Sequence, residues 1–350
     1  MTTRSQEMTD ATVMLKHTLR RDDFELDVDV QIPANGVTGL FGQSGSGKTT
    51  LLRCIAGLEP GTSKDIRPVH KRSIGYVFQT PQLFPHLDVR RNIEFGLRRS
   101  SSPRVDQAQV VEMLGLSDLL ERKPGGLSGG EAQRVAIAAV LLRSPQLVLM
   151  DEPLASLDER RKGELLPYLD RLHDDMSVPM IYVSHNIDEV SRLCDHLLLI
   201  DNGKIIGDGS LHDMLCRLDL PMLSGGNAGS VIEAKPEHYD DGYDLTRFSF
   251  SGGELSVPGQ YDLRRPRVRL RIAAHDVSIC RTKPNDSTIL NILDARVDEV
   301  HVADTASALV RLAIGTDYLL ALITRCSVVR LDIKKGDRLF AQVKSVTVRR

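Results

Sequence analysis

A glycine-rich motif constrains this chain more than any other feature of its 350 residues. Its spacing fits G-x-x-x-x-G-K-[ST], and its residues are Gly42, Gln43, Ser44, Gly45, Ser46, Gly47, Lys48 and Thr49. An apolar, β-branched run at Val37–Phe41 precedes it, and an apolar-rich helix pattern at residues 50–58 follows. Strand, loop and helix are the context in which this motif cradles the phosphates of a nucleotide.

The residue types in this phosphate loop suit an anion. Glycines let successive backbone N–H groups turn toward phosphate oxygens, and the following helix adds its positive end. We expect Lys48 to reach the β- and γ-phosphates and the hydroxyl of Thr49 to bind Mg²⁺, with Thr50 continuing the nucleotide site. The alternative is a glycine-rich turn that binds nothing.

Composition excludes several classes of protein. A formal charge of -2 gives no basic field, so we expect no nucleic-acid partner. Five scattered cysteines without a C-x-x-C pair fit a reducing cytosol rather than a disulfide frame. Residues 1–12 lack the apolar core of a secretory signal, and the longest apolar run, residues 135–142, is far below the roughly 18 residues of a membrane helix. A role at a membrane would therefore require a partner.

The first half of the chain predicts an α/β fold. Residues 12–32 alternate in two runs, which predicts an antiparallel β hairpin beside the nucleotide site. Short apolar strands then alternate with helix patterns, which predicts a parallel sheet covered on both faces. These strands are expected at residues 37–41, 73–78, 147–150, 180–183 and 196–200. Residues 79–124 are expected to form a helical insertion, 201–204 a hairpin turn and 211–218 a closing helix.

The second half predicts a small all-β barrel. A flexible break at residues 224–230 separates it from the first half. Many short strands with turn signals then follow, which is typical of an OB-like barrel. The strands are expected at residues 230–234, 267–272, 292–297, 308–313, 318–323 and 338–348, with a tight turn at 333–337.

An acidic pair ends one of the core strands. Asp151 and Glu152 follow the apolar run 147–150, and such a strand end can sit beside the phosphate loop of a parallel sheet. Asp151 would hold Mg²⁺, and Glu152 would act as general base toward the attacking water. Taken alone, the pair could also be an exposed cap on a strand.

A second glycine motif lies at residues 127–131, just before another helix pattern. Ser128, Gly129 and Gly130 would present a second set of backbone N–H groups at a helix start. One nucleotide does not need two such cradles within one chain. A dimer does, with Ser128 of one copy closing over the γ-phosphate held by the other. Taken alone, the motif could equally be a helix cap.

Two further polar residues follow core strands. Gln79 could touch Mg²⁺ or its water and act as the hinge of the helical insertion, although in isolation a surface glutamine is the better interpretation. His185 could bond the γ-phosphate and orient Glu152, although a lone histidine is more often structural. Residues 156–158 would lie on the dimer seam.

These motifs stand in the order found in the ATPases of ABC transporters, which the chain resembles over about residues 12–222. The resemblance implies a RecA-like P-loop NTPase core with an antiparallel β subdomain and a helical insertion. It also implies ATP and Mg²⁺ as cofactors, a head-to-tail homodimer and transmembrane permease partners, which would place the chain peripherally on the cytoplasmic face of the cell membrane. The family often stacks adenine on an aromatic residue of the first hairpin, and Arg20, Arg21 and Phe24 remain open for that role.

A narrower resemblance involves the second half. Residues 276–278, 287–291, 333–337 and 342–346 look like the Mop (TOBE-like) module in the ATP-binding subunits of molybdate importers. The implied domains are an ABC ATPase domain at 1–229 with a helical subdomain at about 80–126, a linker with a first β unit at 230–285, and a Mop module at 286–350. An oxyanion such as molybdate would use Ser287 and Lys344, and a substrate-binding protein outside the membrane would be an indirect partner.

Other functions remain to be weighed. The same machine could carry sulfate or another solute, and the β module could serve only to strengthen the dimer. A molybdate store or sensor, a P-loop kinase and a DNA-repair ATPase fit the full motif set less well. We expect the permease to contact the helical insertion near Leu83, Phe84 and Pro85, although core packing explains these residues equally well.

Overall fold

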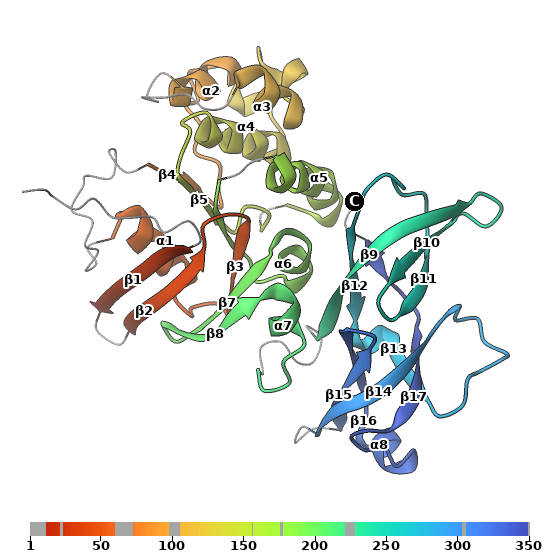
Figure 1. The fold of residues 1–350 in the computed structure, drawn as a ribbon. Helices are drawn as coiled ribbons and strands as arrows, with labels where there is room; N and C mark the ends of the chain where they lie inside the picture. Colours follow the sequence, from red (N-terminus) through yellow and green to blue (C-terminus); the bar gives the residue numbers. More distant parts are fainter. Residues whose placement is uncertain are drawn as a thin grey trace, which may run out of the picture. The chain divides into compact units, whose positions relative to one another are not determined.

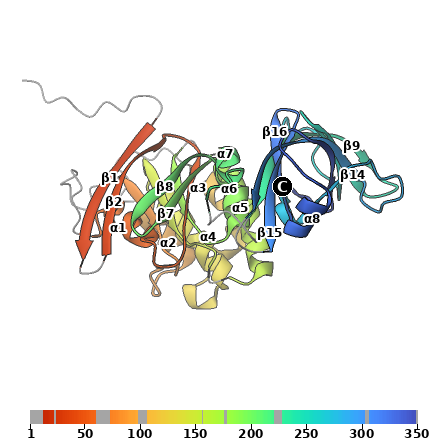
Figure 2. The same ribbon diagram turned by 90° about the horizontal axis from the view of Figure 1, so that it is seen from below.

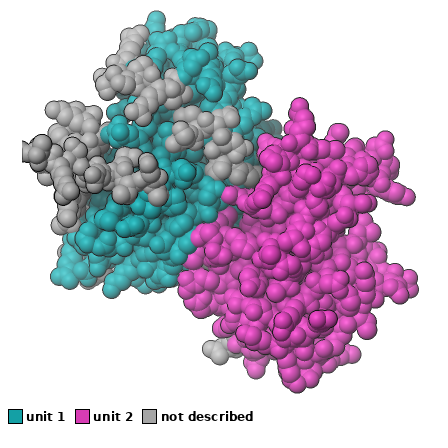
Figure 3. All heavy atoms as spheres, viewed as in Figure 1, with its two compact units in different colours: residues 1–209 teal, residues 210–350 magenta. Residues whose placement is uncertain are grey.

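The computed structural model describes residues 12–21, 24–59, 73–97, 106–155, 157–175, 178–220, 228–302 and 306–348. The chain splits into two compact units, residues 1–209 and residues 210–350, which Figure 3 colours separately. Each unit has its own sheets and its own buried hydrophobic cluster. In the described residues, no helix is both long and apolar enough to span a membrane.

One eight-stranded sheet organises unit 1, in the order β1-β2-β8-β7-β3-β6-β5-β4. β3 pairs in parallel with β6 and β7, and β5 pairs in parallel with β4 and β6. The pairing of β1 with β2 is antiparallel, so the predicted hairpin and parallel sheet are both confirmed. The strands are β1 (Thr12–Arg21), β2 (Phe24–Pro33), β3 (Val37–Phe41), β4 (Ile74–Val77), β5 (Leu147–Asp151), β6 (Met180–Val183), β7 (His196–Asp201) and β8 (Lys204–Ser210).

Helices cover both faces of this sheet. Successive residues of a strand point to opposite faces. On β5, Leu149 joins the cluster that contains Leu51 and Leu52 of α1 (Lys48–Ala56), whereas Met150 faces Leu169 of α5 (Glu159–Asp175). α6 (Ile187–Leu193) lies on the α5 face through Leu193.

The predicted helical insertion is present. α2 (Val89–Leu97), α3 (Gln107–Met113) and α4 (Gly129–Leu141) group together beyond β4 and β5, as Figure 1 shows. α4 packs against α2 and α5, and its buried face includes Val135, Ile137 and Leu141. The insertion is therefore attached to the sheet through the helix that starts at the second glycine motif.

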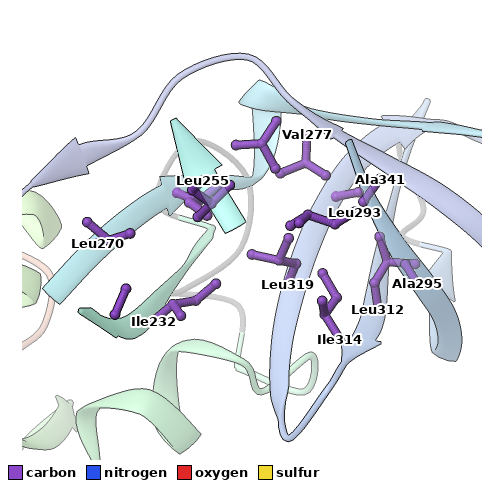
Figure 4. Packing of buried hydrophobic residues seen from close by; sticks show 14 of the residues in the cluster. Ile232, Leu255, Leu270, Val277, Leu293, Ala295, Leu312, Ile314, Leu319 and Ala341 are labelled. Atoms are coloured by element: carbon purple, nitrogen blue, oxygen red, sulfur yellow. The ribbon is translucent and has the colours of Figure 1, made fainter. Parts of the chain in front are cut away.

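Unit 2 begins with the short helix α7 (Leu211–Leu215) and contains two five-stranded sheets, ordered β11-β10-β9-β12-β18 and β13-β17-β14-β15-β16. Figure 2 shows β9, β14, β15 and β16 curving around the interior of the unit. Side chains from both sheets meet there, including Leu255 and Leu270 from the first and Leu293 and Leu319 from the second (Figure 4). The remaining elements are β9 (Gly229–Asp240), β10 (Leu245–Phe250), β11 (Gly253–Pro258), β12 (Val268–Ala273), β13 (Val277–Cys280), β14 (Asn291–Val302), β15 (Ser307–Ile314), β16 (Asp317–Thr324), α8 (Arg325–Arg330), β17 (Arg338–Val343) and β18 (Thr347–Val348).

The predicted all-β fold of the second half is confirmed, with differences in detail. The sequence pattern did not predict β10, β11, β13 or α8. The strand predicted at residues 338–348 is two strands, because the chain leaves the sheet at Lys344, whose backbone N–H donates to the carbonyl of Asp276. Most of the predicted break at 224–230 lies outside the described residues.

Candidate nucleotide-binding site

The phosphate loop connects the end of β3 at Phe41 to the start of α1 at Lys48. Gly47 precedes the helix with a φ of 104°, in the left-handed region that favours glycine. At Gly42, an added Cβ atom would lie 2.3 Å from the carbonyl oxygen of Ile200, so the neighbouring strand leaves no room for a side chain. Gln43, Ser44 and Gly45 are exposed at the tip, and Thr49 and Thr50 are half-buried in the first helical turn.

Lys48 is buried against its own loop. Its Nζ donates to the carbonyl oxygens of Gly42 and Gln43, both at 2.8 Å. Burial lowers the pKa of the Lys48 ammonium from its ordinary value of 10.5, while the charges of Glu152 and Asp151 oppose that shift. The loop therefore encircles the ammonium group, and the two carboxylates stand close enough to act on it.

The turn between β7 and β8 braces the loop from outside. The N–H of Gly203 donates to the carbonyl of Ser46, and the carbonyl of Gly203 accepts from Asp27 on β2. The ring of Phe24 lies against Gly47, because a Cβ added there would be 2.8 Å from the ring. Of the residues considered for adenine, Phe24 thus lies beside the loop, Arg20 pairs with Glu25, and the side chain of Arg21 is outside the described part.

The two oxygens of the Asp151 carboxylate accept bonds from two different elements. Thr49 Oγ1 donates to Oδ1 at 3.0 Å, and the Tyr76 hydroxyl donates to Oδ2 at 2.8 Å. Burial, followed by the bond to Asp151, raises the pKa of Tyr76 above its ordinary value, which keeps the hydroxyl protonated as a donor. Sequence reasoning missed Tyr76; the available signal was a single hydroxyl in the otherwise apolar strand β4, which pairs with β5.

Glu152 and His185 face each other across two adjacent strand ends. Glu152 Oε1 lies 3.4 Å from His185 Nδ1. The backbone of Glu152 has a φ of 46°, an uncommon conformation for a residue other than glycine, and its N–H donates to the carbonyl of Val183. The structure thus brings the two residues predicted to be catalytic next to each other, with the Glu152 side chain partly open to solvent.

Gln79 follows the end of β4 and is exposed. One residue before it, the carbonyl of Phe78 accepts a bond at 3.2 Å from the side chain of Gln133, which is buried on α4. The segment at Gln79 is therefore tied to the helix that starts at the second glycine motif. Sequence reasoning missed Gln133, since a glutamine in a helix pattern gives no signal of its own.

The second glycine motif caps α4. Ser128 Oγ accepts from the N–H of Glu131, and Glu131 Oε2 accepts from the N–H of Ser128 at 2.7 Å, which together form a capping box. Gly129 and Gly130 form the first turn. In the described residues, the hydrogen bonds of Ser128 outside the helix backbone are both to Glu131 of the same helix. Ser156 is outside the described residues, and Asp158 accepts a bond from Arg161 at the start of α5.

The residues predicted to bind an oxyanion lie on unit 2. Ser287 Oγ accepts from the N–H of Ile289 and is 3.4 Å from the side-chain oxygen of Gln342, to which it donates. Lys344 follows two residues later, and both Ser287 and Lys344 are exposed. The two residues thus belong to neighbouring segments, although no direct bond between their side chains is found in the described residues.

Among the residues predicted to meet the permease, Phe84 packs against an aromatic ring of α2. The rings of Phe84 and Phe95 are 4.4 Å apart, and the N–H of Phe84 donates to the side chain of Asn92. Phe84 and Pro85 are exposed, and Leu83 is half-buried. The contact with a permease remains a prediction.

Comparisons with known proteins identify the family of the chain. Residues 26–155 match the family model described as ABC transporter, and residues 287–349 match the TOBE domain. The chain is 50% identical over 343 residues to the molybdenum import ATP-binding protein ModC 1 of Azotobacter vinelandii, covering 93% of this chain and 95% of that protein. It is 47% identical over 340 residues to the molybdenum import ATP-binding protein ModC of Methylococcus capsulatus, covering 93% and 96% respectively.

A solved structure supports the fold of the first unit. The protein cbiO1 from Clostridium perfringens, part of an ABC transporter complex, superimposes with a TM-score of 0.52 at 26% identity. The match covers 59% of this chain and 92% of that chain.

Proposed function

The chain belongs to the ATP-binding proteins of ABC transporters, in the group of molybdenum import proteins, and we propose that it hydrolyses ATP to power molybdate uptake. Tungstate, which has the same charge and shape, would be a second cargo. In the domain assignment that we propose, residues 1–229 form the ATPase domain and residues 286–350 the Mop module, with a linker and first β unit between them.

One observation carries the proposal: a single edge of the sheet holds every group that ATP hydrolysis requires of one chain. The loop encloses Lys48, Thr49 contacts Asp151, and Glu152 faces His185. The carboxyl ends of parallel strands are the usual place for such a site in an open α/β sheet. The identity to molybdenum import proteins over almost the whole chain supports the cargo.

The residues around Asp151 suit Mg²⁺. The ion prefers oxygen ligands, and Thr49 Oγ1 and Asp151 Oδ1 lie 3.0 Å apart, with the amide of Gln79 at the end of the neighbouring strand. We assign these three residues to the metal. When bound, Mg²⁺ would neutralise charge that develops on the transferred phosphoryl group.

The chain's own residues would then divide the remaining work. Backbone N–H groups of residues 42–47 and the ammonium of Lys48 bind and orient the phosphates. Glu152 accepts the proton of the attacking water, and His185, 3.4 Å away, holds Glu152 and contacts the γ-phosphate.

The subunits of an importer work in a larger assembly. As the ATP-binding subunit of an importer, the chain acts as a dimer with membrane permease partners. We further propose that the dimer is head-to-tail, so that Ser128, Gly129 and Gly130 of one copy close over the nucleotide held by the other. The chain would lie on the cytoplasmic face of the membrane, and a substrate-binding protein on the outer side would deliver molybdate.

We also propose that unit 2 binds molybdate through Ser287, Lys344 and nearby backbone N–H groups. Both side chains are exposed and belong to neighbouring segments, one of which includes Gln342. The competing functions are the same machine with sulfate as cargo and an intracellular molybdate store that does not hydrolyse ATP.

The test is uptake into vesicles that contain the chain and its permease subunits, with ATP inside. We expect molybdate uptake that requires ATP and is competed by tungstate, and sulfate should compete poorly. Transport of sulfate in preference to molybdate would show that sulfate is the cargo. Absence of ATP hydrolysis would favour the molybdate store over the importer.

Calorimetric titration of the full-length chain with molybdate, tungstate and sulfate tests the unit 2 site separately, with Lys344→Ala as the variant expected to lose binding.

A further inference from the structure

Behind His185 lies a buried carboxylate that neither the phosphate loop nor the acidic pair explains. Glu189 on α6 is 6% exposed and contacts three polar groups. Its Oε2 accepts from the hydroxyl of Ser184 at 2.8 Å and from that of Tyr182 at 3.1 Å, and its Oε1 lies 3.2 Å from Lys162 Nζ. A charged group buried to this extent is costly unless every lone pair has a partner, so the arrangement needs a reason.

The partners of Glu189 surround the backbone of His185. Ser184 directly precedes the histidine, and its Oγ both donates to Glu189 and accepts from the N–H of Asn186 at 3.0 Å. The hydroxyl of Ser184 therefore links the two residues that flank His185, and its hydrogen bond to Glu189 sets its orientation. His185 itself is exposed, so its side chain has little packing of its own to fix it.

The other oxygen of Glu189 points to a different element. Lys162 lies in the first turns of α5, and its backbone N–H donates to the carbonyl of Asp158. Burial alone would lower the pKa of the Lys162 ammonium, but its bonds to Glu189 and Glu159 raise it above the ordinary value, so the group remains charged. Glu189 thus links the segment of His185 to the helix that begins directly after Asp158.

We propose that Glu189 is a positioning residue. Through Ser184 it fixes the separation between His185 and Glu152, and through Lys162 it makes that separation depend on the position of the start of α5. This rests on the proposed ATP hydrolysis, in which Glu152 and His185 act together. A purely structural role would consist only of satisfying buried hydroxyl groups, and it would not depend on His185.

The experiment is a double-mutant cycle on the full-length chain, with kcat and KM for ATP measured for Glu189→Gln, His185→Ala and both together. The glutamine keeps an oxygen for Ser184 but removes the charge facing Lys162. We expect Glu189→Gln to lower kcat about tenfold with KM within about twofold, because the phosphate loop is untouched. In the His185→Ala background the same change should cost less than about twofold, since residues that act through one another are not additive. If variants that carry His185→Ala hydrolyse ATP too slowly for steady-state assays, single-turnover measurements give their rate of hydrolysis.

Glu164→Gln is the matched control, since it makes the same chemical change in an exposed ion pair with Arg160 on α5. It should leave kcat unchanged. If Glu189→Gln does not fold, Lys162→Met replaces it in the cycle, because this variant keeps the bonds to Ser184 and Tyr182; we expect a drop of about threefold in kcat that again vanishes in the His185→Ala background.

Two results would overturn the inference alone: a kcat for the Glu189 variant equal to that of the control, or losses that multiply in the double mutant while the unmodified chain hydrolyses ATP. A full-length chain without ATP hydrolysis would instead overturn the proposed function, and this inference with it.

Discussion

At the scale of single residues, the carboxylate of Asp151 connects β5 to two other elements of the site. It accepts one hydrogen bond from the Thr49 hydroxyl in the first turn of α1 and another from the Tyr76 hydroxyl on β4. Its orientation is therefore set by two elements. The motif spacing was enough to predict that Thr49 and Asp151 lie close together, which their hydrogen bond confirms. It could not predict Tyr76, because the contact depends on which strand lies beside β5, and that follows from the topology of the whole sheet.

Tyr76→Phe should weaken the interaction with Mg²⁺. Without the hydroxyl, one oxygen of Asp151 loses its donor and the carboxylate is less well oriented toward Thr49. A hydrogen bond to a charged group contributes about 1.5–3 kcal/mol, part of which water replaces, so we expect the half-saturating Mg²⁺ concentration for nucleotide binding to rise about three- to tenfold. Titration of Mg²⁺ against binding of a fluorescent ATP analogue measures it. Tyr243→Phe, at an exposed tyrosine, is the control, and an equal Mg²⁺ dependence in both variants would contradict the prediction.

Glu152→Gln should separate binding from chemistry. A glutamine cannot accept the proton of the attacking water, and a general base contributes roughly two to four orders of magnitude to a rate. We expect hydrolysis to fall by that factor while the affinity for ATP stays near that of the unmodified chain, because the contacts of Lys48 are unchanged. Phosphate release and equilibrium binding of ATP are the two measurements. Near-normal turnover would remove Glu152 from the role of base.

At the scale of elements, the residues that begin α4 serve both as a helix cap and as a predicted nucleotide-binding motif. Ser128 caps the helix, and the bond from its backbone N–H is the main cause that lowers the pKa of Glu131 below its ordinary value of 4.5. A carboxylate whose pKa is lower in the folded state adds stability above its unfolded pKa, and that stability is lost as the pH falls through the lowered value. The capping box therefore contributes fully at neutral pH.

Two substitutions at Ser128 distinguish the cap from the predicted contact with a nucleotide in the second copy. Ser128→Asp keeps a good capping oxygen, whereas Ser128→Ala loses it and should cost about 1 kcal/mol of stability. We expect both variants to lose most ATP hydrolysis, because both lack the hydroxyl, and only Ser128→Ala to unfold more easily. Urea unfolding and phosphate release are measured in parallel. Full activity in Ser128→Asp would mean that the hydroxyl acts only as a cap.

The missed elements of unit 2 have a physical explanation. β10 and β11 do alternate, with Phe248, Leu255 and Val257 buried, but the polar Thr246 fills a buried position of β10, and β11 is bounded by Gly253 and Pro258. Strands β3, β5 and β6 of unit 1 are buried on both faces and give continuous apolar runs, which is why their positions were predicted within one residue.

At the scale of the whole molecule, each unit has its own core. The cluster around Leu40 and Ile181 belongs to unit 1, and the cluster around Phe248 and Leu293 belongs to unit 2. The change from alternating strand and helix patterns to a series of short β runs was sufficient to predict this division into an α/β half and an all-β half. It could not predict how ten strands of unit 2 divide into two sheets, because that depends on pairings between residues far apart in sequence, such as β12 with β18.

Phe248→Ala should therefore affect the units differently. Removing this fully buried ring should destabilise unit 2 by about 3–5 kcal/mol, whereas ATP binding by unit 1 should stay within about twofold. Calorimetric melting with and without ATP would measure both, since a ligand stabilises the unit that binds it. Tyr243→Ala is the control, at a side chain that is 80% exposed. A comparable loss of ATP affinity in Phe248→Ala would contradict independent cores.

The backbone amide of Gly203 can report on the state of the phosphate loop. Its amide hydrogen is bonded to the carbonyl of Ser46, inside the phosphate loop, although Gly203 lies more than 150 residues further along the chain. Exchange of that hydrogen with solvent deuterium requires this bond to open, so its rate follows the opening of the loop itself. The occupancy of the nucleotide site can thus be followed from an unmodified backbone position outside the motif, in the intact protein.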